Sequence, residues 1–337
     1  MTALLAPARA REWWEHKFAP ILGTAYATAC FADASVMDVA DTLLVVLLAL
    51  LPGAVFVSVV NDLTDRDDDR RAGKPDRLAG HSARTWLAVV AAAVLAGFAI
   101  GAAAWHDEPA ALVLYSMAWV AFALYSVPPF RLKARGAGGV LADAVGAHVC
   151  PHLLIAVVVF AAVDRPDDAR WLVAVGAWAL AWGVRGALWH QLSDAEQDAR
   201  AGIRTYAIAH PRWARRLGAW FAFPVELAAF GVLLVLAEAP LAVLAVPAYV
   251  LLEAERVKRW GITVVVVEPA PNYRIAMHDF YVAFFPLAFL ATAALRDPSD
   301  AIVLLAHLGA FPFTPGQIAA DVVRRVRRLS LGGGGSL

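Results

Sequence analysis

The chain has 337 residues, of which 61% are hydrophobic and only 17% are charged, and its mean hydropathy is +0.61. Lysine plus arginine and aspartate plus glutamate each number 29, so no net charge attracts nucleic acid or another polyanion. Long apolar segments recur along the chain, which excludes an ordinary soluble protein and indicates an integral membrane protein.

Nine apolar segments approach the length of about 20 residues that crosses the hydrocarbon core of a bilayer. They are residues 18–33, 41–60, 85–104, 109–126, 139–163, 170–192, 217–237, 240–254 and 277–295. We therefore predict an all-α, polytopic bundle of about nine transmembrane helices in a single domain, residues 1–296. No small-residue cleavage site follows the first basic residues, so we expect no separate signal peptide.

The C-terminal segment is expected to differ from these spans. Residues 301–313 are apolar but short, and Pro315 and Gly316 follow them, so we predict an interfacial or re-entrant segment with a basic tail over residues 297–330. Residues 331–337 are rich in glycine and are interpreted as a flexible tail or a remnant of expression cloning.

Basic residues gather in alternate loops. Lysine and arginine number six in residues 61–84, three in 127–138, five in 194–216 and four in 256–274, and they are scarce in the other loops. The positive-inside rule places these four loops in the cytoplasm, and in a prokaryote the membrane would be the inner membrane. With nine spans, the basic residues 324–328 would lie on the side of the membrane opposite the cytoplasm, against the same rule. Either residues 301–313 bring the chain back to the cytoplasmic side, or the number of spans is wrong by one.

The charged loop after the second span contains a cluster of aspartates. Asp62, Asp65 and Asp69 are spaced i, i+3 and i+7, so they share one helical face, whereas Asp67 and Asp68 are expected to face solvent. Like charges at this spacing repel unless a cation lies between them. Ligands that are all oxygen favour a hard divalent ion such as Mg²⁺, which shares its coordination with phosphate.

The same pattern occurs twice. "DRDDDRRAG" at Asp65–Gly73 and "DAEQDARAG" at Asp194–Gly202 share D-x-x-x-D-x-R-A-G at an offset of 129 residues. Each copy follows an even-numbered predicted span, so the two halves are expected to be parallel repeats that bring both clusters to one membrane face. The alternative is a coincidence in a chain rich in alanine and arginine. Asp194 and Asp198, at i and i+4, are predicted to be further metal ligands.

Three motifs resemble one family. "NDLTDRDDD" resembles the N-D-x-x-D-x-x-x-D motif of the UbiA superfamily of intramembrane aromatic and lipid prenyltransferases, and the second cluster resembles its D-x-x-x-D motif. "YSVPPFRLKARG", Tyr125–Gly136, resembles the Y-S-x-P-P-x-R-x-K loop after the fourth helix of that family. The motifs occur in the family's order.

The resemblance implies a helical bundle around a central cavity, in which two aspartate-rich helices hold two Mg²⁺ ions that bind a prenyl diphosphate. It implies transfer of the prenyl group to a lipophilic or aromatic acceptor. Membrane lipids are expected as further partners, and nucleic acid is not. The metal ligands carried over are Asp62, Asp65, Asp69, Asp194 and Asp198, and the catalytic residues are Asp65, Asp194, Tyr125 and Lys133.

Metal ions and basic side chains together would neutralise the departing diphosphate. The candidates for diphosphate binding are Asn61, Lys74, Arg77, Arg131, Lys133, Arg200 and Arg204. The family usually has an Arg-Pro pair near this point, whereas this chain has Lys74-Pro75 and then Arg77-Leu78. Lys74 and Arg77 are therefore both candidates for contact with the diphosphate.

Three polar residues near the second cluster are open to two interpretations. His190 and Gln191 stand where the first copy has Asn61 and Asp62, and they indicate either a different acceptor or hydrogen bonds that hold Asp194. Asp143, early in the fifth span, either orients the acceptor or is a charge favoured at a helix N-terminus.

His148 and His152 lie at i and i+4, but Pro151 stands between them, so we expect packing or cavity-lining roles rather than metal binding. Two alternative functions remain at this point. One is a terpene cyclase or carotenoid-modifying enzyme on the same scaffold, and the other is a cation-coupled transporter that uses the aspartate clusters.

Overall fold

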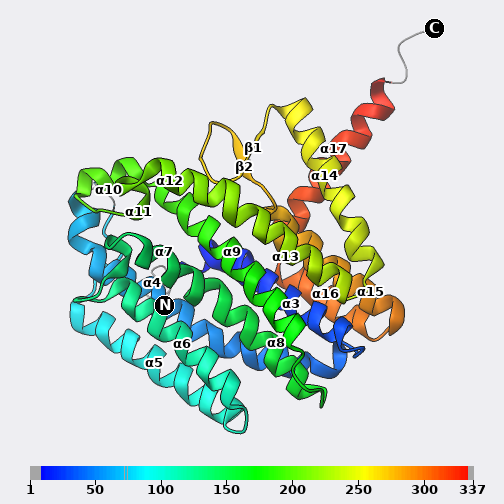
Figure 1. Ribbon diagram of the computed structural model, residues 1–337, viewed down its shortest axis with the longest axis horizontal. Helices are drawn as coiled ribbons and strands as arrows, with labels where there is room; N and C mark the ends of the chain where they lie inside the picture. Colours follow the sequence, from blue (N-terminus) through cyan, green and yellow to red (C-terminus); the bar gives the residue numbers. More distant parts are fainter. Residues whose placement is uncertain (1–8, 72, 74, 333–337) are drawn as a thin grey trace.

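In a bilayer no water satisfies backbone N–H and C=O groups, so apolar segments fold into helices that satisfy them internally. The structure is a computed structural model that describes residues 9–71, 73 and 75–332, and it confirms the predicted all-α bundle (Figure 1). One pair of strands interrupts it, with β1 (Thr263–Val265) parallel to β2 (Tyr273–Ile275).

The first half of the chain forms α2 (Ala10–Trp13), η2 (Trp14–Phe18), α3 (Ala19–Phe31), η3 (Met37–Val39), α4 (Ala40–Arg71), α5 (Ala83–Trp105), α6 (Pro109–Ser126), η4 (Leu132–Ala134), α7 (Ala137–Ala144), η5 (Val145–Val149) and α8 (Cys150–Ala162). The second half forms α9 (Ala169–Ser193), α10 (Ala195–Ala201), α11 (Tyr206–Ala209), α12 (Pro211–Arg216), η6 (Leu217–Ala222), α13 (Phe223–Leu236), α14 (Pro240–Trp260), η7 (Phe280–Phe284), α15 (Phe285–Arg296), α16 (Asp300–Ala310) and α17 (Phe313–Gly332).

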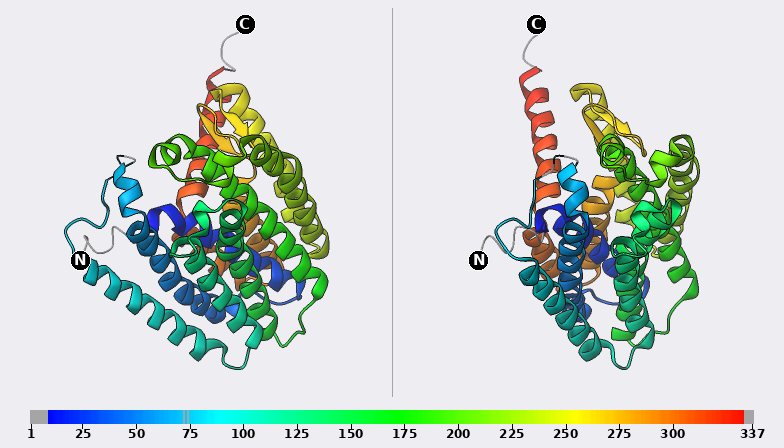
Figure 2. Two further views of the ribbon diagram at one scale, coloured as in Figure 1. Left: turned by 60° about the vertical axis from the view of Figure 1, so that its left-hand side comes forward. Right: turned by 90° about the vertical axis from the view of Figure 1, so that its left-hand side faces the viewer.

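The predicted number of spans is not confirmed. Within the described residues, six helices are long and apolar enough to cross a membrane, or seven if the bent pair α16 and α17 counts as one span. The remaining expected spans fall on α3, on α14, which carries charges in its last turns, and on the 17-residue helix Phe280–Arg296. Helix α16 meets α17 at 89°, the shape of a broken span or a re-entrant loop, and Figure 2 shows α17 projecting beyond the bundle.

Four π-helical segments in the described helices share one cause. η2, η5, η6 and η7 each end two residues before a proline, namely Pro20, Pro151, Pro224 and Pro286. A proline lacks the N–H that would bond the carbonyl four residues earlier, and its ring crowds that carbonyl. A wider turn relieves the clash and re-aims the side chains of the segment, which include Lys17 and His148.

Helix α3 forms the centre of the bundle. Twelve of its 13 residues are buried, and it packs against α8 and α15. Helix α5, by contrast, lies at the periphery and exposes Leu87 and Leu95, as expected for a helix that faces lipid (Figure 1). The polar residues discussed below are therefore arranged around a buried, apolar centre.

The internal repeat is visible in the backbone. Gly73 and Gly202 both have positive φ, 74° and 76°, and end their aspartate-bearing helices. Their N–H groups bond the carbonyls of Arg70 and Ala199, which are again 129 residues apart. Glycine tolerates this left-handed conformation best, so the shared R-A-G sequence ends both helices in the same way.

Candidate active site

The C-terminal end of α4 and the junction of α9 with α10 enclose a polar cavity of about 160 Å³. Its lining residues are Asp65, Asp68, Asp69, Tyr125, Lys133, His190, Gln191, Asp194, Asp198, Ile203 and Thr205. Helices α4 and α10 are also in contact. The two aspartate clusters therefore meet at one cavity, as the repeat predicts.

Asp65 is held by two cations from the loop after α6. Arg131 donates from Nη2 to the Asp65 carboxylate at 2.8 Å, and Lys133 forms a second ion pair with it. Burial lowers the pKa of Lys133, and the neighbouring Asp65 opposes that effect. Burial also disfavours the charged form of Arg131, but its hydrogen bonds to Asp65 and Asp68 outweigh this and raise its pKa.

Asp67 and Asp68 behave differently from each other. The Asp67 side chain is 84% exposed, as predicted, and among the described residues it forms an ion pair with the exposed Arg70. The prediction was wrong for Asp68, whose side chain is only 8% exposed and pairs with Arg71 and Arg131. The cause is the loop after α6, which lays Arg131 across α4, a contact that helical spacing alone does not reveal.

Asp62 lies on the other side of the cluster. It lines a smaller cavity of about 50 Å³ together with Arg77 and Asp69, and Asp69 lines both cavities. Arg9 and Arg77 each approach the Asp62 carboxylate to 3.9 Å, while its Oδ2 atom is buried without a hydrogen-bond partner. The three aspartates of the first motif thus serve two adjoining cavities.

Several predicted site residues either tie neighbouring helices together or lie away from the two cavities. Asn61 accepts a hydrogen bond from Ser126 of α6, and Gln191 accepts one from the N–H of Ala207 at 3.2 Å, so each ties a helix to its neighbour. Arg200 pairs with an exposed glutamate, and neither it nor Arg204 is among the described residues that line the cavities. Lys74 lies outside the described residues.

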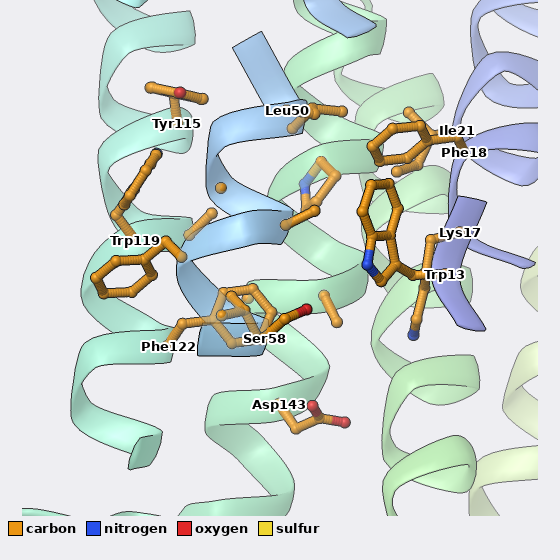
Figure 3. Close-up of a pocket in the computed structure, with 18 of the residues that line it drawn as sticks. Trp13, Lys17, Phe18, Ile21, Leu50, Ser58, Tyr115, Trp119, Phe122 and Asp143 are labelled. Carbon is orange, nitrogen blue, oxygen red and sulfur yellow. The ribbon is translucent and has the colours of Figure 1, made fainter. Parts of the chain in front are cut away.

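A second, apolar cavity of about 240 Å³ adjoins the polar one (Figure 3). Helices α3, α4, α6 and α8 and the segments η2 and η5 supply most of its lining. The lining residues are Trp13, Lys17, Phe18, Ile21, Leu50, Gly53, Ala54, Phe56, Val57, Ser58, Tyr115, Ala118, Trp119, Phe122, Asp143, Gly146, Ala147, Pro151 and His190. His190 lines both cavities, so the polar and apolar spaces meet at its side chain.

Lys17 and Trp13 are lining residues that the sequence reasoning did not nominate. Lys17 could have been found from the sequence, because it stands directly before the first apolar helix. An ionisable side chain at the edge of a membrane span is costly unless it has a function. Lys17 contacts His148 at 2.9 Å, and His152 contacts Thr24 at 2.7 Å. Both histidines are buried and packed, in line with the role expected for them.

The polar cavity suits magnesium in its chemistry. Five carboxylates line it, from Asp65, Asp68, Asp69, Asp194 and Asp198, and hard oxygen ligands are what Mg²⁺ prefers. Among the described residues no three acidic, histidine or cysteine side chains converge closely enough to hold an ion alone. Mg²⁺ usually completes its coordination with water and phosphate oxygens, so these residues fit an ion that arrives with a diphosphate.

Comparison with known proteins decides the family. The model of the UbiA prenyltransferase family matches residues 21–261, a range that contains both aspartate clusters and the Arg131 loop. The chain belongs to the UbiA prenyltransferase family. This confirms the resemblance of the three motifs.

Two curated relatives of this UbiA family member are named lycopene elongase/hydratase. The protein from Haloarcula japonica is 31% identical over 47% of this chain and 50% of its own length. The protein from Haloferax volcanii is 33% identical over 59% of this chain and 62% of its own length. The matches thus span between half and about three fifths of these relatives.

Solved structures support the fold. A UbiA homologue from Archaeoglobus fulgidus, bound to GPP and Mg²⁺, aligns with a TM-score of 0.58 at 18% identity, covering 87% of this chain and 99% of that chain. The same homologue bound to DMAPP and Mg²⁺ aligns with a TM-score of 0.58 at 19% identity and the same coverage. The UbiA fold therefore extends over most of this chain.

Proposed function

We propose that this UbiA family member transfers a prenyl group from an allylic isoprenoid diphosphate to a hydrophobic acceptor inside the membrane, with Mg²⁺ as its cofactor. The junction of the two cavities at His190 carries the proposal. A space lined by carboxylates and cations suits a diphosphate, and the adjoining apolar space suits an isoprenoid chain. One substrate of this class would occupy both.

The polar cavity binds and neutralises the diphosphate. Asp65, Asp194 and their neighbours would hold the magnesium, and Lys133, Arg131 and Arg77 lie close enough to the carboxylates to share the added negative charge. Bound Mg²⁺ supplies the positive charge that makes diphosphate a better leaving group. The Archaeoglobus homologue, which was solved with GPP or DMAPP and Mg²⁺, supports this assignment.

The apolar cavity protects the carbocation that remains. Departure of diphosphate takes the electron pair of the C–O bond, so the allylic carbon becomes a cation that water would capture. Trp13, Trp119 and Phe122 line the cavity and present aromatic groups, which attract cations and exclude water. The cation is therefore kept for the acceptor.

The relatives' names support a linear polyene of the carotenoid class as acceptor. In that case a terminal C=C of the acceptor supplies the electron pair for the new C–C bond, and the positive charge moves to the acceptor. Loss of a proton then gives an alkene, and addition of water followed by loss of a proton gives an alcohol. Either product contains both donor and acceptor, whereas intramolecular cyclisation would release the donor carbon skeleton alone.

The basic loops around the polar cavity support an orientation with this cavity facing the cytoplasm. In a prokaryote the enzyme would then bind a cytoplasmic diphosphate donor from the inner membrane. Transport coupled to cations is less well supported, because the carboxylates lie at helix ends next to paired cations rather than in broken helices near the membrane midplane.

The test uses the purified full chain in liposomes that contain lycopene, with DMAPP or GPP added outside. We expect diphosphate release and a donor-plus-lycopene adduct in the presence of Mg²⁺, and neither in the presence of a chelator. Release with full activity after chelation would contradict the metal assignment. Release without an adduct, across lycopene and quinone-precursor acceptors, would favour cyclisation, and cation flux without release would favour transport.

A further inference from the structure

We infer that Asp143 and His190 together accept the proton at the end of the reaction, either from the acceptor cation or from the water that captures it. The inference rests on the proposed function and names a further step at the same site. Both residues line the apolar cavity, and neither side chain forms a hydrogen bond or ion pair with another within the described part of the chain.

Asp143 is half-buried in the wall of an apolar cavity inside a membrane, where an ionisable group is costly and indicates a ligand or a reaction step, and the exposed His190 lies where that cavity meets the polar one. Asp143 comes from α7, and His190 comes from the last turns of α9. A structural carboxylate at this depth would be expected to pair directly with a cation, as Glu226 does with Arg185 deeper in the bundle. Asp143 faces the cavity instead.

The position of Asp143 matches the place where the acceptor cation would form. In Figure 3 the Asp143 carboxylate, Ser58 and the amine of Lys17 lie at one end of the cavity, while Leu50 and Tyr115 lie at the other. Helix α4 runs from Leu50 through Ser58 to Asp65, so the polar end is the one nearest the diphosphate site. Ser58 and Asp65 are about 10 Å apart along the helix.

This end of the cavity is also where the new bond must form. The carbon that loses diphosphate stays close to the polar cavity, so the acceptor double bond that attacks it must reach the same end. The positive charge then appears on the acceptor carbon next to the new bond. A carboxylate and an imidazole there can take the proton, either from the adjacent C–H, whose electrons form the alkene, or from an attacking water.

Close packing of the two helices fixes the pair. A Cβ atom on Gly183 of α9 would come within 2.8 Å of the Cα of Ala144, the residue that follows Asp143. Gly183 and His190 are seven residues apart and thus share a face of α9. The face that packs most closely on α7 therefore also carries His190 towards the cavity.

The experiment compares Asp143→Asn and His190→Gln with wild type, using the full chain, Mg²⁺, DMAPP and lycopene. The readout is the amount of adduct formed per diphosphate released. Without a proton acceptor the adduct cation persists until the new C–C bond breaks again, and water then captures the released donor cation as a free prenyl alcohol and gives its proton to solvent. We expect the ratio to fall at least about 100-fold in each variant, the lower end of the range for general base catalysis.

The matched controls are Asp107→Asn and His106→Gln, which make the same changes in an exposed turn between α5 and α6. Both should keep the wild-type ratio. A variant that is merely misfolded loses diphosphate release and adduct together, so its ratio does not change. Asp143→Glu keeps the carboxylate and should retain more of the ratio than Asp143→Asn.

The outcomes separate the two proposals. A wild-type ratio in both Asp143→Asn and His190→Gln overturns the inference while the proposed function stands. Absence of diphosphate release from the wild-type enzyme with every donor overturns the proposed function itself. If Asp143→Asn yields no folded protein, the other two variants decide. A lower ratio of adduct to diphosphate in His190→Gln, together with a retained ratio in Asp143→Glu, supports the assignment.

Discussion

The side-chain nitrogen of Lys17 lies 2.9 Å from Nε2 of His148, and each residue belongs to a π-helical segment that ends two residues before a proline. The contact joins the start of the first buried helix to the helix that follows Asp143. Lys17 also lines the polar end of the apolar cavity (Figure 3). Two local distortions of the backbone thus place a half-buried amine next to a buried imidazole.

Lys17→Met should destabilise the protein. The substitution removes the only described hydrogen-bond partner of the His148 ring, whose Nδ1 atom is already buried without one. A buried polar group that loses its partner costs about 1–3 kcal/mol. Thermal unfolding in detergent should show a lower midpoint for Lys17→Met, and no change for Lys258→Met, where the lysine is exposed on α14. Equal midpoints would show that the contact adds no stability.

Asp65→Asn and Asp194→Asn should each reduce diphosphate release at saturating Mg²⁺ by at least about 10- to 100-fold, the loss expected when the groups around a metal are changed. Both carboxylates line the polar cavity from opposite copies of the repeat. Asp67→Asn is the control, because Asp67 lies on the same helix but is 84% exposed. A similar loss in all three variants would point to a general effect of charge rather than to metal binding.

The repeat and its spacing were sufficient to predict that two aspartate clusters meet. Helical periodicity fixes which residues share a face, and a repeat fixes which helix ends share a side of the membrane. Asp68 and Lys17 were not predicted in this way, because their surroundings depend on the path of a loop and on contacts between distant helices. Such contacts leave no periodic pattern in the sequence.

The number of spans was harder to predict than the site for a related reason. Hydropathy finds long apolar helices such as α4 and α5, but α14 combines a membrane-length helix with charged last turns. There Arg256 is buried in ion pairs with Glu253, Asp279 and Asp321. The predicted segment 240–254 covers only the apolar part of α14, and the charged turns that complete the helix keep it out of the six described spans.

Donor binding should weaken at alkaline pH because of Lys133. Burial lowers the pKa of Lys133 below its ordinary value, so its ammonium group loses the proton at a lower pH than an exposed lysine does. The charged form attracts diphosphate and exists below this pKa, so the KM for the donor should rise as the pH passes through it. Lys133→Arg keeps its charge over roughly pH 7 to 10 and should lose this rise. If the KM for the donor rises in the same way at alkaline pH in Lys133→Arg, the rise belongs to the titration of another group.

Gly183→Ala should disrupt the site although the side chain touches no substrate. The added Cβ would lie 2.8 Å from Cα of Ala144, so α7 and α9 must separate, and they carry Asp143 and His190. Overpacking of this kind costs about 1–3 kcal/mol. Gly186→Ala is the control on the same helix, since nothing lies within 4 Å of its Cβ position. We expect a lower unfolding midpoint and less adduct per diphosphate released for Gly183→Ala only. Equal behaviour of the two variants would mean that α7 and α9 can separate without cost.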